Sequence, residues 1–182
     1  MSKTLVKIVD ASLFPAALMV AGKFIGLYLV LNIFNLEWGV ENTPNSIVSA
    51  RPVLLGEDLA FASSYSDLFV ILLMLLGFSY YVIKAVFFHS SHIDPRLATR
   101  LAINGLFDLV KDSFEIYNKA SIWLLFVWLT NVTIIVNTLM GKTYTWVLLF
   151  SVTISLLLTI ILLRDVAYEI NIAQGKIKNY SS

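Results

Sequence analysis

The chain has 182 residues, of which 58% are hydrophobic and 14% are charged, whereas soluble domains contain roughly half and a quarter. Its 13 basic and 12 acidic residues nearly cancel, which excludes the basic patch of a nucleic-acid-binding protein. The lack of cysteine excludes disulfides, thiolate catalysis and cysteine-ligated metal centres. This composition indicates an integral membrane protein that forms a single membrane domain over residues 1–182.

Four long apolar segments predict transmembrane helices, because each has about the 20 residues needed to cross a ~30 Å hydrocarbon layer. We expect the spans at about 13–36, 68–88, 122–140 and 144–163. Helices are favoured since the bilayer offers no water to bond the backbone. The predicted fold is therefore an all-α integral membrane protein with four transmembrane helices. Residues 37–67 form the predicted outer loop, in which 47–55 is either a short extended piece or a segment lying on the surface.

The segment between the second and third spans predicts an amphipathic cytoplasmic helix at about 95–119. Asp94 and the proline after it are typical of a helix start. From Ile103 onward, apolar residues recur at helical spacing, and charged residues occupy the opposite arc, with Glu115 and Lys119 as an i,i+4 pair. The charge of this arc is balanced to acidic, which disfavours capture of anionic lipid headgroups. We expect the helix to pack beneath the bundle, lie at the interface or contact a partner protein.

Basic residues are distributed unevenly between the two sides of the predicted membrane. Ten lie on the side that holds both termini, and only Arg51 and Lys142 lie on the other side. Because cytoplasmic loops carry an excess of lysine and arginine, this distribution predicts that both termini are cytoplasmic. We therefore expect a multi-pass protein of the plasma (inner) membrane, with residues 164–182 as a cytoplasmic tail.

Lys23 is a charged residue inside the first predicted span. It lies ten residues from the inner edge, or ~15 Å deep, and its side chain is too short to reach the interface easily. The same depth on the other helices holds hydroxyls and amides but no carboxylate, because Asp67 falls at the outer end of its predicted span. The candidate ligand or assembly residues at this level are Lys23, Tyr80, Asn131, Thr133, Thr153 and Ser155.

A charged lysine at this depth costs at least ~2.5–3.5 kcal/mol unless something compensates it. Four states lower that cost: a neutral amine, a carboxylate from another subunit, a bound anion, or a water-filled cavity. The alternative is a lysine bonded by Asn131 and backbone carbonyls, which only fixes the packing. Gly22 and Gly26 on the same segment have the spacing that lets two membrane helices pack closely.

His89, His92 and Asp94 are weak metal candidates at the inner end of the second span. Two histidines three residues apart share one side of a helix, and a carboxylate nearby adds a third ligand type. No further ligand follows at a fixed spacing, and the serines and proline around them indicate that the helix is ending. We therefore predict no metal site and no cofactor. No motif of a known catalytic type is present, so no catalytic residue is predicted.

These observations favour a non-enzymatic subunit of a homo- or hetero-oligomeric membrane assembly. Its expected partners are the lipid bilayer and other membrane subunits or copies of itself, without nucleic acid. The alternative is a channel or transporter with an intramembrane anion or polar-solute site around Lys23. A third hypothesis is an interfacial membrane enzyme that uses His89, His92 and Asp94.

Overall fold

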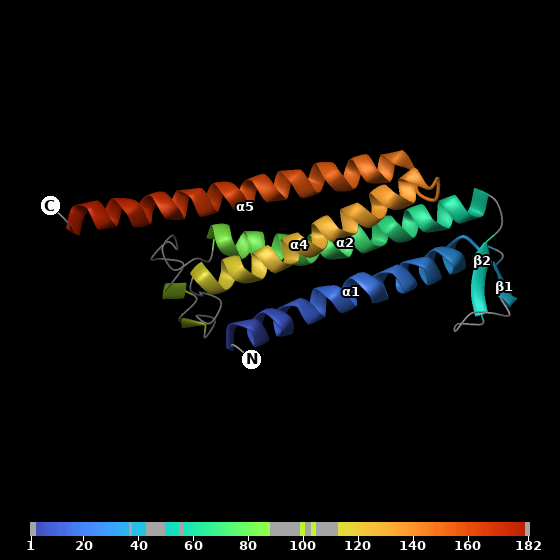
Figure 1. Ribbon diagram of the computed structural model, residues 1–182, viewed down its shortest axis with the longest axis horizontal. Helices are drawn as coiled ribbons and strands as arrows, with labels where there is room; N and C mark the ends of the chain where they lie inside the picture. The colour runs from blue at the N-terminus through green and yellow to red at the C-terminus, as the bar shows by residue number, and fades with distance from the viewer. Residues whose placement is uncertain are drawn as a thin grey trace.

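A computed structural model describes residues 3–36, 38–42, 50–54, 57–87, 99–100, 103–104 and 113–180. Its main feature is a bundle of four long helices, drawn in Figure 1: α1 (Lys3–Ile33), α2 (Glu57–Phe87), α4 (Ser113–Leu139) and α5 (Thr145–Tyr180). Each helix contains a stretch long and apolar enough to cross a membrane: Ile8–Ile33, Asp58–Phe87, Glu115–Leu139 and Thr145–Asn171. The four predicted spans are thus confirmed as helices, and they indicate a multi-pass membrane protein in contact with lipid.

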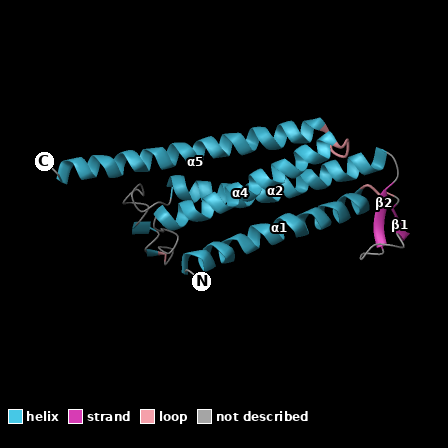
Figure 2. Cartoon of the chain, in the orientation of Figure 1, coloured by secondary structure: helices cyan, strands magenta, loops and turns pink. Residues whose placement is uncertain are grey.

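The connection between α1 and α2 contains a small antiparallel hairpin, shown as arrows in Figure 2. Strand β1 (Trp38–Asn42) pairs with β2 (Ala50–Leu54), with Trp38 opposite Leu54. Strand β2 lies within 47–55, where an extended piece was one of the two expected forms. Helix α2 then begins at Glu57, eleven residues before the expected start of the second span.

The connection between α2 and α4 is largely outside the described residues. Helix α4 begins at Ser113, so residues 113–119 form the first turns of the same continuous helix as the third span. Of the remaining predicted amphipathic helix, only 99–100 and 103–104 are described. The weak metal candidates His89, His92 and Asp94 also lie outside the described residues.

Two helices end in turns with a left-handed residue, which satisfies their last carbonyl groups. Asn35 (φ 50°) follows α1, and the Leu36 N–H donates to the Leu31 carbonyl at 3.1 Å. Gly141 (φ 70°) follows α4, and the Lys142 N–H donates to the carbonyl five residues earlier at 2.8 Å. The second turn reverses the chain sharply, so the residues joining α4 to α5 lie close to the end of the bundle.

Helices α2 and α4 are the two inner elements, because each contacts all three of the other helices, and α2 supplies much of the core. Its inward face includes the fully buried side chains of Ile71, Met74 and Phe78. Two glycines lie where α2 packs closely against another helix, one against α1 and one against α4. A Cβ on Gly26 of α1 would lie 3.0 Å from Phe69, and one on Gly77 of α2 would lie 2.0 Å from the Trp123 ring. A methyl group at Gly77 would require Trp123 to shift, and one at Gly26 would require its neighbours to give way by a few tenths of an ångström.

Candidate functional site

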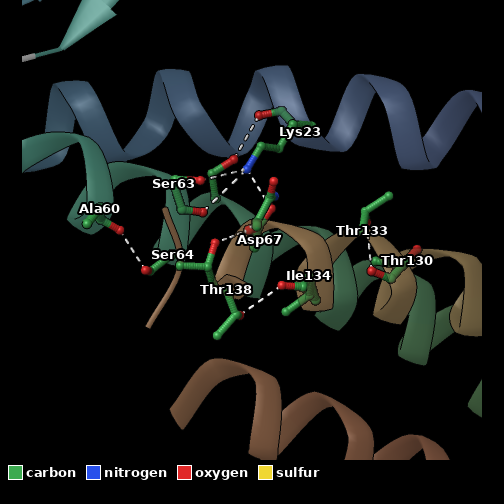
Figure 3. A network of polar contacts seen from close by, with 12 residues as sticks. Lys23, Ala60, Ser63, Ser64, Asp67, Thr130, Thr133, Ile134 and Thr138 are labelled. Atoms are coloured by element: carbon green, nitrogen blue, oxygen red, sulfur yellow. Dashed lines mark hydrogen bonds and ion pairs between the residues drawn. The ribbon is translucent and has the colours of Figure 1, made fainter. Parts of the chain in front are cut away.

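Lys23 of α1 forms an ion pair with Asp67 of α2 inside the bundle. The Lys23 Nζ lies 2.5 Å from Asp67 Oδ1, and it also contacts the Ser63 carbonyl oxygen at 3.3 Å and its Oγ at 3.5 Å, as Figure 3 shows. The expectation that no carboxylate of this chain shares the level of Lys23 is therefore wrong. Its counter-charge comes from the neighbouring helix.

The two charges meet because their helices are antiparallel and place them at equal distances from the same end. Lys23 lies ten residues before the end of α1 at Ile33, and Asp67 lies ten residues after the start of α2 at Glu57. At 1.5 Å per residue both are ~15 Å from that end. The prediction failed because the apolar segment used to place the second span begins after Asp67, whereas the helix itself begins well before it.

Asp67 accepts hydrogen bonds at both carboxylate oxygens. Its Oδ2 accepts from Asn137 Nδ2 of α4 at 3.0 Å and from Thr143 Oγ1 of the α4–α5 turn at 2.6 Å. The Asp67 side chain is only 6% exposed. Buried ion pairs are tolerated when further hydrogen bonds satisfy the charged groups, and two such bonds reach the Asp67 oxygen that does not face Lys23. We call Lys23, Ser63, Asp67, Asn137 and Thr143 the Asp67 cluster.

Two buried serines of α2 connect the same region to the backbone of its neighbours. Ser66 Oγ donates to the carbonyl of Lys23 at 3.0 Å. Ser64 Oγ donates to the Ala60 carbonyl at 2.6 Å and accepts from the Tyr144 N–H at 2.8 Å. Two consecutive residues of the α4–α5 turn therefore bond α2: Thr143 donates to Asp67, and the Tyr144 N–H donates to Ser64. Together these contacts fix the direction from which each donor reaches the carboxylate.

The polar residues expected at the level of Lys23 do not converge on it. Asn131 and Ser155 are buried and bond each other, with Asn131 Nδ2 2.8 Å from Ser155 Oγ. Thr133, Thr153 and Tyr80 are exposed on the outside of the bundle. The hydroxyl of Thr133 donates to a backbone carbonyl three residues earlier, at 2.7 Å, as Figure 3 also shows. These residues join helices or face outward, and the expected belt is not a single site.

Asn131 does not bond Lys23, contrary to the packing alternative. Its Nδ2 also donates to the Val127 carbonyl at 3.1 Å, and its Oδ1 is buried without a hydrogen-bond partner in the described part of the chain. Lys23 is nevertheless held within the protein, by Asp67 and Ser63. The residues of the candidate site that sequence reasoning missed are Asp67 and the partners Ser63, Asn137 and Thr143. Three polar residues spaced along one face of a helix, Ser63, Ser66 and Asp67, were the signal available for α2.

The Asp67 cluster offers charge and hydrogen bonds but no catalytic arrangement. Among the described residues, no group of three or more histidine or acidic side chains is placed to hold a metal ion. The lysine already has a carboxylate partner, so it does not require a bound anion. Asp67 is already bonded by three donors, so it presents no vacant side to a cation. The arrangement can hold α1, α2 and α4 in register and place one amine near the bundle surface.

No family model matches the chain, and no curated protein or solved structure matches it. The site is therefore interpreted from its own chemistry. That chemistry is a pair of opposite charges within the candidate spans, with the negative member buried among three donors. The positive member is less enclosed, and its side chain is 38% exposed.

Proposed function

We propose that the chain is a non-enzymatic subunit of a homo- or hetero-oligomeric membrane assembly, and that the surface around Lys23 contacts a neighbouring subunit. The supporting observation is the unequal burial of the ion pair. The Asp67 side chain is 6% exposed, whereas that of Lys23 is 38% exposed. The helices of this chain thus enclose the carboxylate but leave part of the lysine side chain uncovered.

The exposed part of Lys23 lies ~15 Å from the helix end, where a bundle on its own would be surrounded by lipid. An ammonium group has three donors, and hydrocarbon can accept no hydrogen bond from any of them. The contacts to Ser63, at 3.3 and 3.5 Å, are longer than the one to Asp67. A carbonyl or hydroxyl of an adjacent helix would offer Lys23 a shorter hydrogen bond than the two to Ser63, because such groups bond between membrane helices.

We further propose that both termini face the cytoplasm, and that the membrane is the plasma (inner) membrane. The ten basic residues on one side against two on the other support this orientation. The N- and C-termini lie at the same end of the bundle in Figure 1, as four spans require. A cysteine accessibility assay in intact cells tests the orientation, since a cysteine placed in the α4–α5 turn should react with an impermeant reagent added outside.

Site-specific cross-linking tests the assembly proposal, and the chain suits it because it contains no cysteine. Val20 is one helical turn from Lys23 and shares its face, whereas Leu157 lies on α5. Both side chains are 56% exposed, so they form a matched pair. Val20→Cys and Leu157→Cys are each labelled with a photoreactive benzophenone maleimide in native membranes, illuminated, and resolved on a denaturing gel.

The proposal predicts a discrete protein adduct from position 20 and a much weaker one from position 157. An adduct of twice the chain mass indicates self-assembly, and any other discrete mass indicates a different subunit. If position 20 labels lipid alone, as position 157 is expected to do, the surface around Lys23 is not a subunit contact. Val20→Cys replaces an exposed residue, so the variant should fold like the original chain.

Transport is the second proposal, because an amine and a carboxylate within the spans are typical of solute and proton pathways. The buried Asp67 changes which species we expect to be transported. An anion bound by Lys23 would have to compete with Asp67, so we expect a proton or a polar solute instead. Flux into liposomes should be lost in Lys23→Met and in Asp67→Asn while the variants remain folded. Equal flux in all three proteins would exclude a transport role for the pair.

A further inference from the structure

A second polar site lies between α2 and α4, at the end of the bundle that holds both termini. It is a pocket of about 190 Å³, separate from the Asp67 cluster, and it is lined by Tyr80, Tyr81, Lys84, Glu115, Ile116 and Lys119. The lining combines two ammonium groups and two phenol hydroxyls, all hydrogen-bond donors. This combination of donors is suited to an anion.

The charges of the pocket leave one cation in excess. Lys119 Nζ pairs with Glu115 Oε1 at 2.8 Å, as the i,i+4 spacing predicted. Lys84 lies over the Tyr80 ring, 5.0 Å from its centroid, and forms no ion pair within the described residues. Along the sequence, the arc around Glu115 and Lys119 has balanced charge and disfavours anionic lipids. The fold changes that balance, because α2 adds Lys84 to the same pocket.

The position of the pocket favours a lipid over a soluble anion. Lys84 lies three residues before the end of α2 at Phe87, and Glu115 begins the candidate span of α4. Because both positions are close to an end of a candidate span, we expect headgroup phosphates at this level. The side chains of Leu76 and Ile83, which precede Lys84 on α2 and so lie on its bilayer side, are 69% and 50% exposed, and they offer apolar surface to an acyl chain. Basic pockets between helices at this depth are suited to acidic headgroups.

We propose that this pocket binds the phosphate of an anionic membrane lipid. Lys84, which has no ion-pair partner among the described residues, provides one cation and Lys119 a second, and the hydroxyls of Tyr80 and Tyr81 donate to the phosphate oxygens. The acyl chains extend along the exposed apolar face of α2. The site does not depend on the proposed assembly role, since the pocket is formed within one chain.

Lipid retention measured by native mass spectrometry tests the proposal. The purified protein is equilibrated in nanodiscs of equal phosphatidylglycerol and phosphatidylcholine, and the lipids that remain bound after release are counted. We expect preferential retention of phosphatidylglycerol. Lys84→Gln with Lys119→Gln should reduce the preference roughly thirtyfold, about fivefold for each lysine. Lys142→Gln, a lysine at the opposite end of the bundle, is the matched control and should leave the preference unchanged.

A second variant changes the affinity in the opposite direction. Glu115→Gln removes the negative charge of the pocket and releases Lys119, so it should increase phosphatidylglycerol retention about fivefold. A damaged protein would not show such a gain. Equal retention by the original chain and the double variant would overturn the proposal, and so would no gain in Glu115→Gln. Displacement of the lipid by millimolar inorganic phosphate would also overturn it, because it would identify a soluble phosphate as the ligand.

Discussion

Replacing Asp67 by asparagine isolates the energetic role of the ion pair. The substitution preserves side-chain size but removes the charge that faces Lys23 Nζ at 2.5 Å. It also places an amide group where the carboxylate accepts from Asn137 and Thr143. Removing one member of a buried pair costs ~3–5 kcal/mol, because the other charge is left uncompensated. We expect about 3 kcal/mol, the lower end of that range, since the Lys23 side chain is 38% exposed.

A double-mutant cycle measures this energy directly. The free energy of unfolding is obtained for the original chain, Asp67→Asn, Lys23→Met and the double variant by denaturant titration in mixed micelles. The four tryptophans supply the fluorescence signal. The double variant should be less destabilised than the sum of the single ones, by ~1–3 kcal/mol. Asp58→Asn, an exposed carboxylate on the same helix, should change stability by less than ~0.5 kcal/mol. If the losses of unfolding free energy from Asp67→Asn and Lys23→Met add within ~0.5 kcal/mol, the two side chains do not stabilise the chain as an ion pair.

Two further substitutions test the packing around the site by the same unfolding assay. Gly77→Ala should destabilise the chain by ~1–3 kcal/mol, because the new methyl group would lie 2.0 Å from the Trp123 ring. Adding Trp123→Leu should relieve part of that cost, and a strictly additive pair would contradict the steric explanation. Ser155→Ala removes the hydroxyl that accepts from Asn131 and should cost only ~0.6 kcal/mol, the average for such bonds in membranes. A loss of unfolding free energy above ~2 kcal/mol would contradict the view that this hydrogen bond only joins α4 to α5.

The sequence was sufficient for the spans because hydropathy depends only on local composition. It was insufficient for the ion pair because the position of Asp67 depends on where α2 begins. Ser63, Ser66 and Asp67 lower the local hydropathy, so the apolar segment starts after them. In the fold the same residues face α1 and are protected from lipid. Hydropathy alone therefore predicts a loop for the polar start of α2, and it gives Lys23 no partner.

The remaining contacts of the cluster had no sequence signal of their own. Asn137 and Thr143 reach Asp67 across 70 and 76 residues, and no spacing rule joins positions so far apart. Their convergence depends on the turn at Gly141, whose positive φ reverses the chain after α4. Gly26 shows the same limit, since its spacing from Gly22 predicted close packing but did not identify α2 as the neighbour.

The ion pair also bears on how the chain enters the bilayer during its synthesis. A first helix that entered alone would carry an uncompensated lysine, at a cost of ~2.5–3.5 kcal/mol. Asp67 follows Lys23 by 44 residues, on the next helix. Insertion of α1 and α2 as a hairpin whose charges already cancel is therefore the less costly route. Asn137 and Thr143 are made later, so the hydrogen bonds around the carboxylate are completed only after α4 has joined the first two helices.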